Sequence, residues 1–321
     1  MKRPLWLVAA VVAVMIGTAG CAAPANPTTT TIGLTYIPNI QFAPFYNADQ
    51  AGWGEAGAVV LRHHGSSEGL FTALTSGQEQ LVVAGGDEIL AARSQGIDVM
   101  AVAAYYRRYP VRLIVPADSP IQTTADLKGH TIGLPGRYGE SWYGLVVALR
   151  QAGLTEQDVT IADIGYTQQA ALSTGQVDAV VGFANSDQIN FATAGFPTRA
   201  IDPQVPLVSI CLATSTAWAQ DHPQTLRQII AAMERGMRQA IDDPASTLTN
   251  AGHYIPGFRD QVLAQAEQVL PATTALFVDS TGQLSPVLDD DGWRAMAEAM
   301  IATGFVDAGL DPTQAYSNAY Q

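Results

Sequence analysis

The stretch Ala73-Leu-Thr-Ser-Gly-Gln78, followed by Leu81-Val-Val83, occurs twice in this chain with small changes. The second copy reads Ala171-Leu-Ser-Thr-Gly-Gln176, followed by Ala179-Val-Val181. Each copy has the pattern of a helix end, a glycine that stops the helix, and a short apolar run typical of a buried strand. Two copies of this unit predict two lobes of similar structure.

A second repeat lies ahead of each copy, because Ile32-Gly-Leu34 recurs as Ile132-Gly-Leu134. Around these repeats, short apolar runs alternate with helical patterns, as in a parallel sheet covered by helices. We therefore expect an α/β fold, with a mostly parallel sheet flanked by helices in each lobe. In the first lobe, strands are expected at 31–36, 59–62, 80–84 and 99–104, and helices at 42–52, 70–76 and 88–94.

The chain is expected to cross from one lobe to the other at two apolar runs, Val111–Pro116 and Val205–Ala213. The first lobe is predicted to comprise residues 31–113 and 208–321, and the second lobe residues 114–207. Helical patterns dominate the C-terminal part of the chain. Because one of its helices carries a continuous apolar stripe, we expect this part to pack against the first lobe.

The N-terminus has the order of a secretory signal. Lys2 and Arg3 precede an apolar run and a small-residue segment that ends at Cys21. The apolar run is shorter than the roughly 20 residues that a membrane-spanning helix needs. The pattern resembles a bacterial lipoprotein signal, so we expect residues 1–20 to be removed and Cys21 to carry lipid, with 21–30 as a polar tether. Cleavage by an ordinary signal peptidase is the alternative.

Charge and cysteine content narrow the function classes. The formal net charge of −13, with Lys128 as the single lysine beyond the predicted signal, disfavours nucleic-acid binding, which needs clustered cations. Cys211 is the second of two cysteines and lies in an apolar run. If Cys21 is lipidated, Cys211 is expected to be a buried free thiol.

Two short motifs match the residue patterns of enzyme signatures. Gly52-Trp-Gly-Glu-Ala-Gly57 spells a dinucleotide-binding loop, but it follows a predicted helix and precedes a strand, the reverse of the order such a loop requires. Gly65-Ser-Ser-Glu-Gly69 spells the nucleophile loop of an esterase and leaves a secreted hydrolase using Ser67 as an alternative. Neither a cofactor nor a metal is expected, and the chain is predicted not to be an enzyme.

Aromatic, amide and glycine residues gather in loops that follow predicted strands, namely 36–46 and 85–87 in the first lobe and 136–143 and 182–187 in the second. Open α/β sheets bind ligands at the carboxyl ends of their strands. Aromatic faces stack on flat rings, and glycines let the backbone approach a ligand. The candidate ligand-binding residues are Tyr36, Asn39, Phe42, Ser67, Gly86, Asp87, Tyr138, Gly139, Trp142, Tyr166 and Asn185.

Five segments in order carry a family resemblance: Tyr36-Ile-Pro-Asn39, Ala43-Pro-Phe-Tyr46, Ala73-Leu-Thr-Ser-Gly77, Asp126-Leu-Lys-Gly129 and Ile132-Gly-Leu-Pro-Gly136. They resemble the substrate-binding proteins of ABC importers related to thiamine-pyrimidine synthase, which include binders of sulfonates, thiamine pyrimidine precursors and riboflavin. The resemblance implies a two-lobed periplasmic-binding-protein fold of type II. It also implies ABC permease subunits as partners, and we expect a monomer anchored by lipid on the extracytoplasmic face of the cell membrane.

The same resemblance implies a ligand. The Ile-Pro-Asn loop with its aromatic neighbours is similar to those of the pyrimidine- and riboflavin-binding members, and an aromatic cleft favours a flat neutral ring such as riboflavin. A thiamine pyrimidine precursor or a sulfonate such as taurine is the alternative. The stretch Gly182-Phe-Ala-Asn185 contains no cysteine, unlike the cysteine-rich segment of the synthases. This difference argues against a pyrimidine-synthase-like enzyme.

Particular roles follow for the cleft residues. Tyr36, Tyr138 and Trp142 are expected to stack on the ring or line it. Asn39, Asp87, Asn185 and backbone groups near Gly139 are expected to bond its polar edge.

Overall fold

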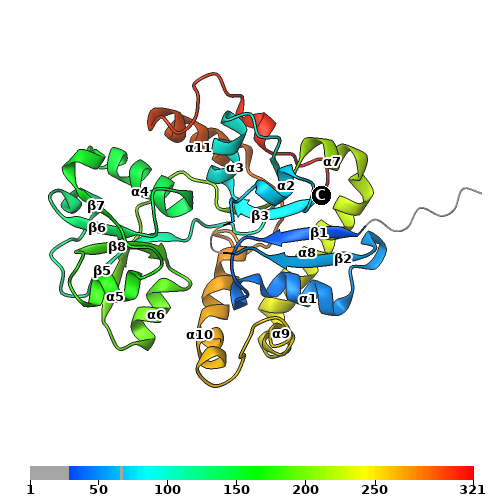
Figure 1. The fold of residues 1–321 in the computed structure, drawn as a ribbon, viewed down its shortest axis with the longest axis horizontal. Helices are drawn as coiled ribbons and strands as arrows, with labels where there is room; N and C mark the ends of the chain where they lie inside the picture. Colours follow the sequence, from blue (N-terminus) through cyan, green and yellow to red (C-terminus); the bar gives the residue numbers. More distant parts are fainter. Residues whose placement is uncertain (1–28, 66–67) are drawn as a thin grey trace, which may run out of the picture.

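The computed structural model describes residues 29–65 and 68–321, which form two lobes joined by two connections (Figure 1). The predicted signal, the lipid-bearing Cys21, most of the predicted tether and Ser67 lie outside the described residues. Within the described parts of the chain, no helix combines the length and the apolar character needed to cross a membrane.

Each lobe is built around a five-stranded mixed sheet, and the two sheets have the same strand order. In each, three strands run parallel and a fourth, antiparallel to both of its neighbours, separates them from the fifth. In spatial order, the first sheet contains β2 (Val59–His63), β1 (Thr30–Leu34), β3 (Leu81–Gly85), β10 (Ile210–Thr214) and β4 (Met100–Ala104). The second contains β7 (Thr160–Asp163), β6 (Thr131–Leu134), β8 (Ala179–Phe183), β5 (Val111–Pro116) and β9 (Thr198–Ile201).

The repeats of the sequence occupy equivalent places in the two sheets. Ile32 on β1 pairs with Leu81 on β3 in parallel register. Ile132 on β6 pairs with Ala179 on β8 in the same way. The prediction of two similar α/β lobes is therefore confirmed down to strand register.

Helices cover both faces of each sheet, because alternate residues of the strands point to opposite sides. In β3, for example, Leu81 and Val83 face one apolar core while Val82 and Ala84 face another. The first core is covered by α1 (Ala43–Ala51), α7 (Thr216–Asp221), α8 (Pro223–Asp242), α9 (Pro244–Ala251) and α10 (Asp260–Phe277). The second is covered by α2 (Thr72–Thr75), α3 (Gly86–Ser94) and α11 (Asp290–Ala302).

The second lobe repeats this layering with fewer helices (Figure 1). The helix α4 (Gly139–Gln151) packs on one face of its sheet, and α5 (Gln168–Ser173) and α6 (Asp187–Thr193) pack on the other. Short 3₁₀ turns complete the connections: η1 (Ile40–Phe42), η2 (Gly54–Ala56), η3 (Thr124–Leu127), η4 (Glu156–Asp158) and η5 (Pro312–Ala315).

Both apolar runs expected at the crossovers contribute strands. Val111–Pro116 is β5, a strand of the second sheet flanked by β8 and β9. The end of Val205–Ala213 lies in β10, between β3 and β4. These strands are apolar because both of their faces are covered. The chain passes between the sheets just before each of them, at 105–110 and 202–209.

The C-terminal helices pack on the first lobe, as their apolar stripe predicts. The stripe of α8 is buried, and α8 crosses α1 so closely that a Cβ on Gly236 would overlap the carbonyl oxygen of Pro44. Cys211 is a fully buried free thiol on β10, and burial raises its pKa well above the ordinary value of a thiol.

Candidate functional site

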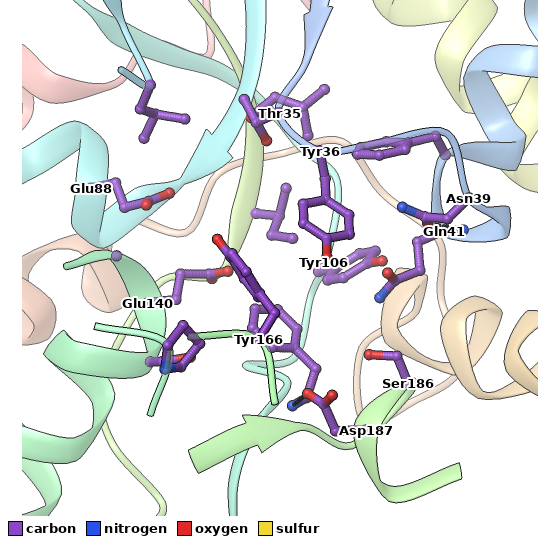
Figure 2. Close-up of a pocket in the computed structure, with 18 of the residues that line it drawn as sticks. Thr35, Tyr36, Asn39, Gln41, Glu88, Tyr106, Glu140, Tyr166, Ser186 and Asp187 are labelled. Carbon is purple, nitrogen blue, oxygen red and sulfur yellow. Dashed lines mark hydrogen bonds between the residues drawn. The ribbon is translucent and has the colours of Figure 1, made fainter. Parts of the chain in front are cut away.

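A cavity of about 380 Å³ lies between the lobes, where the carboxyl ends of parallel strands from both sheets meet. Residues that follow β1, β3, β6, β7 and β8 contribute to it. In Figure 2, Glu88 and Glu140 lie on one side of the view, Asn39 and Gln41 on the other, and tyrosines between them. The lining also includes Thr35, Leu70, Val83, Pro135, Gly139, Ser141, Gln168, Ser186, Asp187, Asn190 and Ile210.

Seven aromatic side chains line this cavity: Tyr36, Phe42, Tyr105, Tyr106, Tyr138, Tyr166 and Phe183. Tyr105 and Tyr106 are buried and stacked, with ring centroids 5.0 Å apart, and form one wall of the cavity. Tyr36 of the first lobe and Tyr166 of the second meet with centroids 5.6 Å apart, although 38% and 54% of their surfaces stay exposed. Tyr138 is 56% exposed. Three tyrosines are thus free to stack on a flat ligand.

The loop after β1 is held in shape by its own asparagine. Asn39 Oδ1 accepts a hydrogen bond from the backbone N–H of Gln41 at 2.8 Å, and its Nδ2 donates to the carbonyl oxygen of Ile37 at 2.8 Å. These two bonds fix the turn that starts η1. They also place Gln41 and Phe42 in the cavity wall.

A cluster of three carboxyl groups joins the lobes beside the cavity. Glu88 lies at the start of α3, its Oε2 accepting from the backbone N–H of Gly85 at 2.9 Å. Glu140 lies at the start of α4, and its Oε1 is buried without a hydrogen-bond partner among the described residues. The hydroxyl of Tyr109, in the first connection, lies 2.7 Å from Asp87 Oδ2 and 2.8 Å from the carbonyl oxygen of Glu140. Tyr109 thus bridges one lobe to the other.

Burial raises the pKa of all three carboxyl groups. Burial first, and then the charge of Glu88, raise the pKa of Asp87 to about 8. Burial raises the pKa of Glu88 to about 7. Burial and the two neighbouring carboxyls raise the pKa of Glu140 well above its ordinary value. A protonated carboxyl both donates and accepts hydrogen bonds, so Glu88 and Glu140 can pair with either kind of ligand atom.

The cavity holds no cation among the described residues that line it. Arg137 lies in the adjacent loop, but its guanidinium sits 5.4 Å from the centre of the Trp142 ring and 3.8 Å from a carboxyl oxygen of Asp163. An anionic ligand would therefore meet carboxyl groups without a compensating positive charge.

Six of the residues predicted from the sequence line the cavity: Tyr36, Asn39, Phe42, Tyr138, Gly139 and Tyr166. Gly139 starts α4 with φ +68°, a backbone conformation that favours glycine. A Cβ at this position would also lie only 3.1 Å from Glu88 Oε1.

Four other predicted residues lie behind the cavity wall. Gly86 packs against the second connection, where a Cβ would collide with Val208. Asp87 is buried against Tyr109. Trp142 belongs to the apolar core between α4 and the second sheet. Asn185 is buried and donates to Thr273 Oγ1 of α10 at 3.0 Å, which links the lobes directly.

Sequence reasoning missed nine polar lining residues: Thr35, Gln41, Glu88, Glu140, Ser141, Gln168, Ser186, Asp187 and Asn190. Glu88, Glu140 and Asp187 each stand in the first turn of a helix that follows a strand. That position was the available signal, because first-turn residues of such helices face the carboxyl edge of the sheet.

Comparisons with known proteins agree with this arrangement. Residues 39–247 match the model of a family described as NMT1/THI5 like. The riboflavin-binding protein RibY of Chloroflexus aurantiacus is 31% identical over 313 residues, covering 94% of this chain and 89% of that protein. The formylaminopyrimidine-binding protein of Halalkalibacterium halodurans is 25% identical over 178 residues, 54% of each chain.

Among solved structures, the periplasmic aliphatic sulphonate binding protein SsuA of Escherichia coli superimposes with a TM-score of 0.71 at 17% identity. The match covers 90% of this chain and 92% of that one. This likeness shows the periplasmic-binding-protein fold and confirms the fold predicted from the sequence.

Proposed function

The chain belongs to the NMT1/THI5-like family, and from that premise we propose that it is the solute-binding component of an ABC importer that captures riboflavin. It binds the vitamin outside the cytoplasmic membrane without converting it and delivers it to permease subunits. Lipid at Cys21 would keep the monomer near the permease and so raise its effective concentration there.

The observation that carries this proposal is the aromatic cavity between the lobes. Riboflavin has a flat, uncharged heteroaromatic ring, and each stacked aromatic pair contributes about 0.5–1.5 kcal/mol beyond the burial of area. Tyr36, Tyr138 and Tyr166 have exposed faces for such stacking, and they come from both lobes. The relative named as a riboflavin-binding protein supports the same ligand.

The polar groups of the cavity suit the edge of such a ring. The pyrimidine side of riboflavin alternates carbonyl acceptors with an N–H donor. In their protonated forms, Glu88 and Glu140 can bond to either kind of ring atom, and Gln41 carries both an acceptor and a donor. Glu140 Oε1, buried without a partner among the described residues, gains most from a ligand because an unmatched buried polar atom costs about 1–3 kcal/mol.

A thiamine pyrimidine precursor is the second candidate. The relative named as a formylaminopyrimidine-binding protein favours it, and an exocyclic amino group could donate to Glu88 or Glu140. A sulfonate has less support, since no cation lines the cavity among the described residues.

The test is a titration of the purified protein with riboflavin, thiamine, an aminopyrimidine precursor of thiamine, and taurine. Stacking should quench flavin fluorescence at micromolar or lower riboflavin concentrations, and the flavin should be recovered chemically unchanged. Binding of another compound without riboflavin would refute the ligand. Turnover of any compound would refute the transport role.

A further inference from the structure

A second cavity adjoins the first within the second lobe. It measures about 440 Å³ and opens between the start of α5 and the start of α6. Four residues line both cavities: Tyr166, Gln168, Asp187 and Asn190. A ligand in the inter-lobe cavity therefore borders this groove directly.

The groove differs from the inter-lobe cavity in chemistry. Beyond the four shared residues, it is lined by Thr167, Gln169, Ala170, Ser173 and Phe191. The side chains that line the groove carry mainly hydroxyl, amide and carboxyl groups, whereas seven aromatic rings line the inter-lobe cavity. A single ligand that fills both must be aromatic at one end and polar at the other.

Several polar atoms in the groove are free to bind. Gln168 is 8% exposed, and its side chain makes no hydrogen bond within the described residues. Asp187 uses Oδ2 to accept from the backbone N–H of Phe183 at 2.7 Å, which leaves its other oxygen available. Asn190 accepts from Gln265 through Oδ1 and keeps its amide donor. Amide and carboxyl groups of this kind match hydroxyls, each of which donates once and accepts twice.

We propose that this groove binds a polyhydroxylated chain attached to the ring that occupies the inter-lobe cavity. The inference rests on the proposed function, in which the ligand is riboflavin, and assigns the ribityl chain to residues 166–173 and 187–191. The groove recognises an uncharged chain, because a carboxyl lines it and no cation does among the described residues.

The experiment compares riboflavin with lumiflavin, which has the same ring system and a methyl group in place of the ribityl chain. Riboflavin is expected to bind at least about tenfold tighter, the effect of one or two hydrogen bonds in a desolvated site. Ala170→Leu narrows the groove at an exposed helical position, where leucine is well tolerated. Ala192→Leu is the matched control, since Ala192 is exposed on α6 and lines neither cavity.

Ala170→Leu should weaken riboflavin to the affinity of lumiflavin and leave lumiflavin unchanged, while Ala192→Leu should change neither. Retained lumiflavin binding also shows that the variant is folded. Equal binding of the two flavins to the natural protein would overturn the inference while the proposed function stands. An equal loss of both flavins in Ala170→Leu would overturn it too. Failure of both flavins to bind the natural protein would refute the proposed function, and this inference with it.

Discussion

Replacing Glu140 by glutamine is expected to make the stability of the protein less dependent on pH. Glu140 is buried between the lobes, beside Asp87 and Glu88, with one carboxyl oxygen unbonded among the described residues. Glutamine keeps the size of the side chain and its capacity to donate and accept hydrogen bonds, but it does not titrate. The variant therefore separates the effect of the titrating proton on stability from the effect of the size and shape of the side chain.

The direction of the effect follows from the protons that each state binds. An unfolded chain releases the Glu140 proton near the ordinary pKa of a glutamate, about 4.3. In the folded protein, burial and the neighbouring carboxyls raise this pKa well above that value and so retain the proton. Between the ordinary and the raised pKa, unfolding releases a proton, so the free energy of unfolding falls as pH rises.

The size of the effect follows from the same linkage. One proton corresponds to at most about 1.4 kcal/mol per pH unit, so Glu140 steepens the decline of the free energy of unfolding by up to that amount per pH unit between its ordinary and its raised pKa. Glu140→Gln should remove this share of the slope. Asp87 and Glu88, whose pKa values are raised to about 8 and about 7, should leave a smaller decline that flattens above those values.

The measurement is urea unfolding at half-unit steps of pH for the natural protein and for Glu140→Gln. Glu298→Gln serves as the matched control, because Glu298 is exposed on α11 and lies far from the carboxyl cluster in sequence. The control should reproduce the natural slope. Parallel slopes for the natural protein and Glu140→Gln would refute the idea that Glu140 holds a proton in the folded state.

Three further changes have defined outcomes. Tyr166→Leu should weaken riboflavin binding by roughly two- to tenfold in a fluorescence titration, because it removes one stacked pair; unchanged affinity would exclude stacking on Tyr166. Riboflavin 5′-phosphate should bind at least about tenfold more weakly than riboflavin in the same titration, since the described residues that line the two cavities include carboxyls and no cation. Tighter binding would contradict this account of charge. Gly236→Ala should lower the free energy of unfolding by more than about 1 kcal/mol, because the new Cβ would overlap the carbonyl oxygen of Pro44. This loss is expected even though alanine is a better helix former than glycine. A gain in stability would show that α1 and α8 can separate.

The sequence predicts the fold well because the fold depends on local patterns that occur twice. The pairing of Ile32 with Leu81, and of Ile132 with Ala179, reproduces the two repeats as equivalent neighbouring strands. The apolar run Val111–Pro116 was harder to place. An apolar strand buried on both faces and a buried connection have the same composition, and only the pairing of β5 with β8 and β9 distinguishes them.

The site was only partly predictable, since its polar half depends on how the lobes meet. Tyr36 and Tyr138 could be placed from the loops that carry them. Trp142 could have been assigned to the core, because it forms a helical stripe with Leu145 and Leu149, and all three are buried on one face of α4. Glu140 is signalled only by its place in the first turn of a helix that follows a strand, and this place does not predict that it is buried. An acid in the first turn of a helix usually favours the helix dipole in solvent, and its burial follows from contact with the other lobe.

Contacts that join the lobes also surround the proposed ligand. Tyr36 meets Tyr166 across the cavity, and Tyr109 bridges Asp87 to the backbone of Glu140 beside it. A flat ring must part Tyr36 from Tyr166 to enter between them, and it then replaces one contact between the lobes with two contacts to itself. Separating the lobes would expose the carboxyl cluster to water and remove the burial that raises its pKa values, so we expect protonation of the cluster to favour the arrangement seen here. If the ring binds only to this arrangement, ligand and protons stabilise the same state, and we expect each to raise the affinity of the protein for the other.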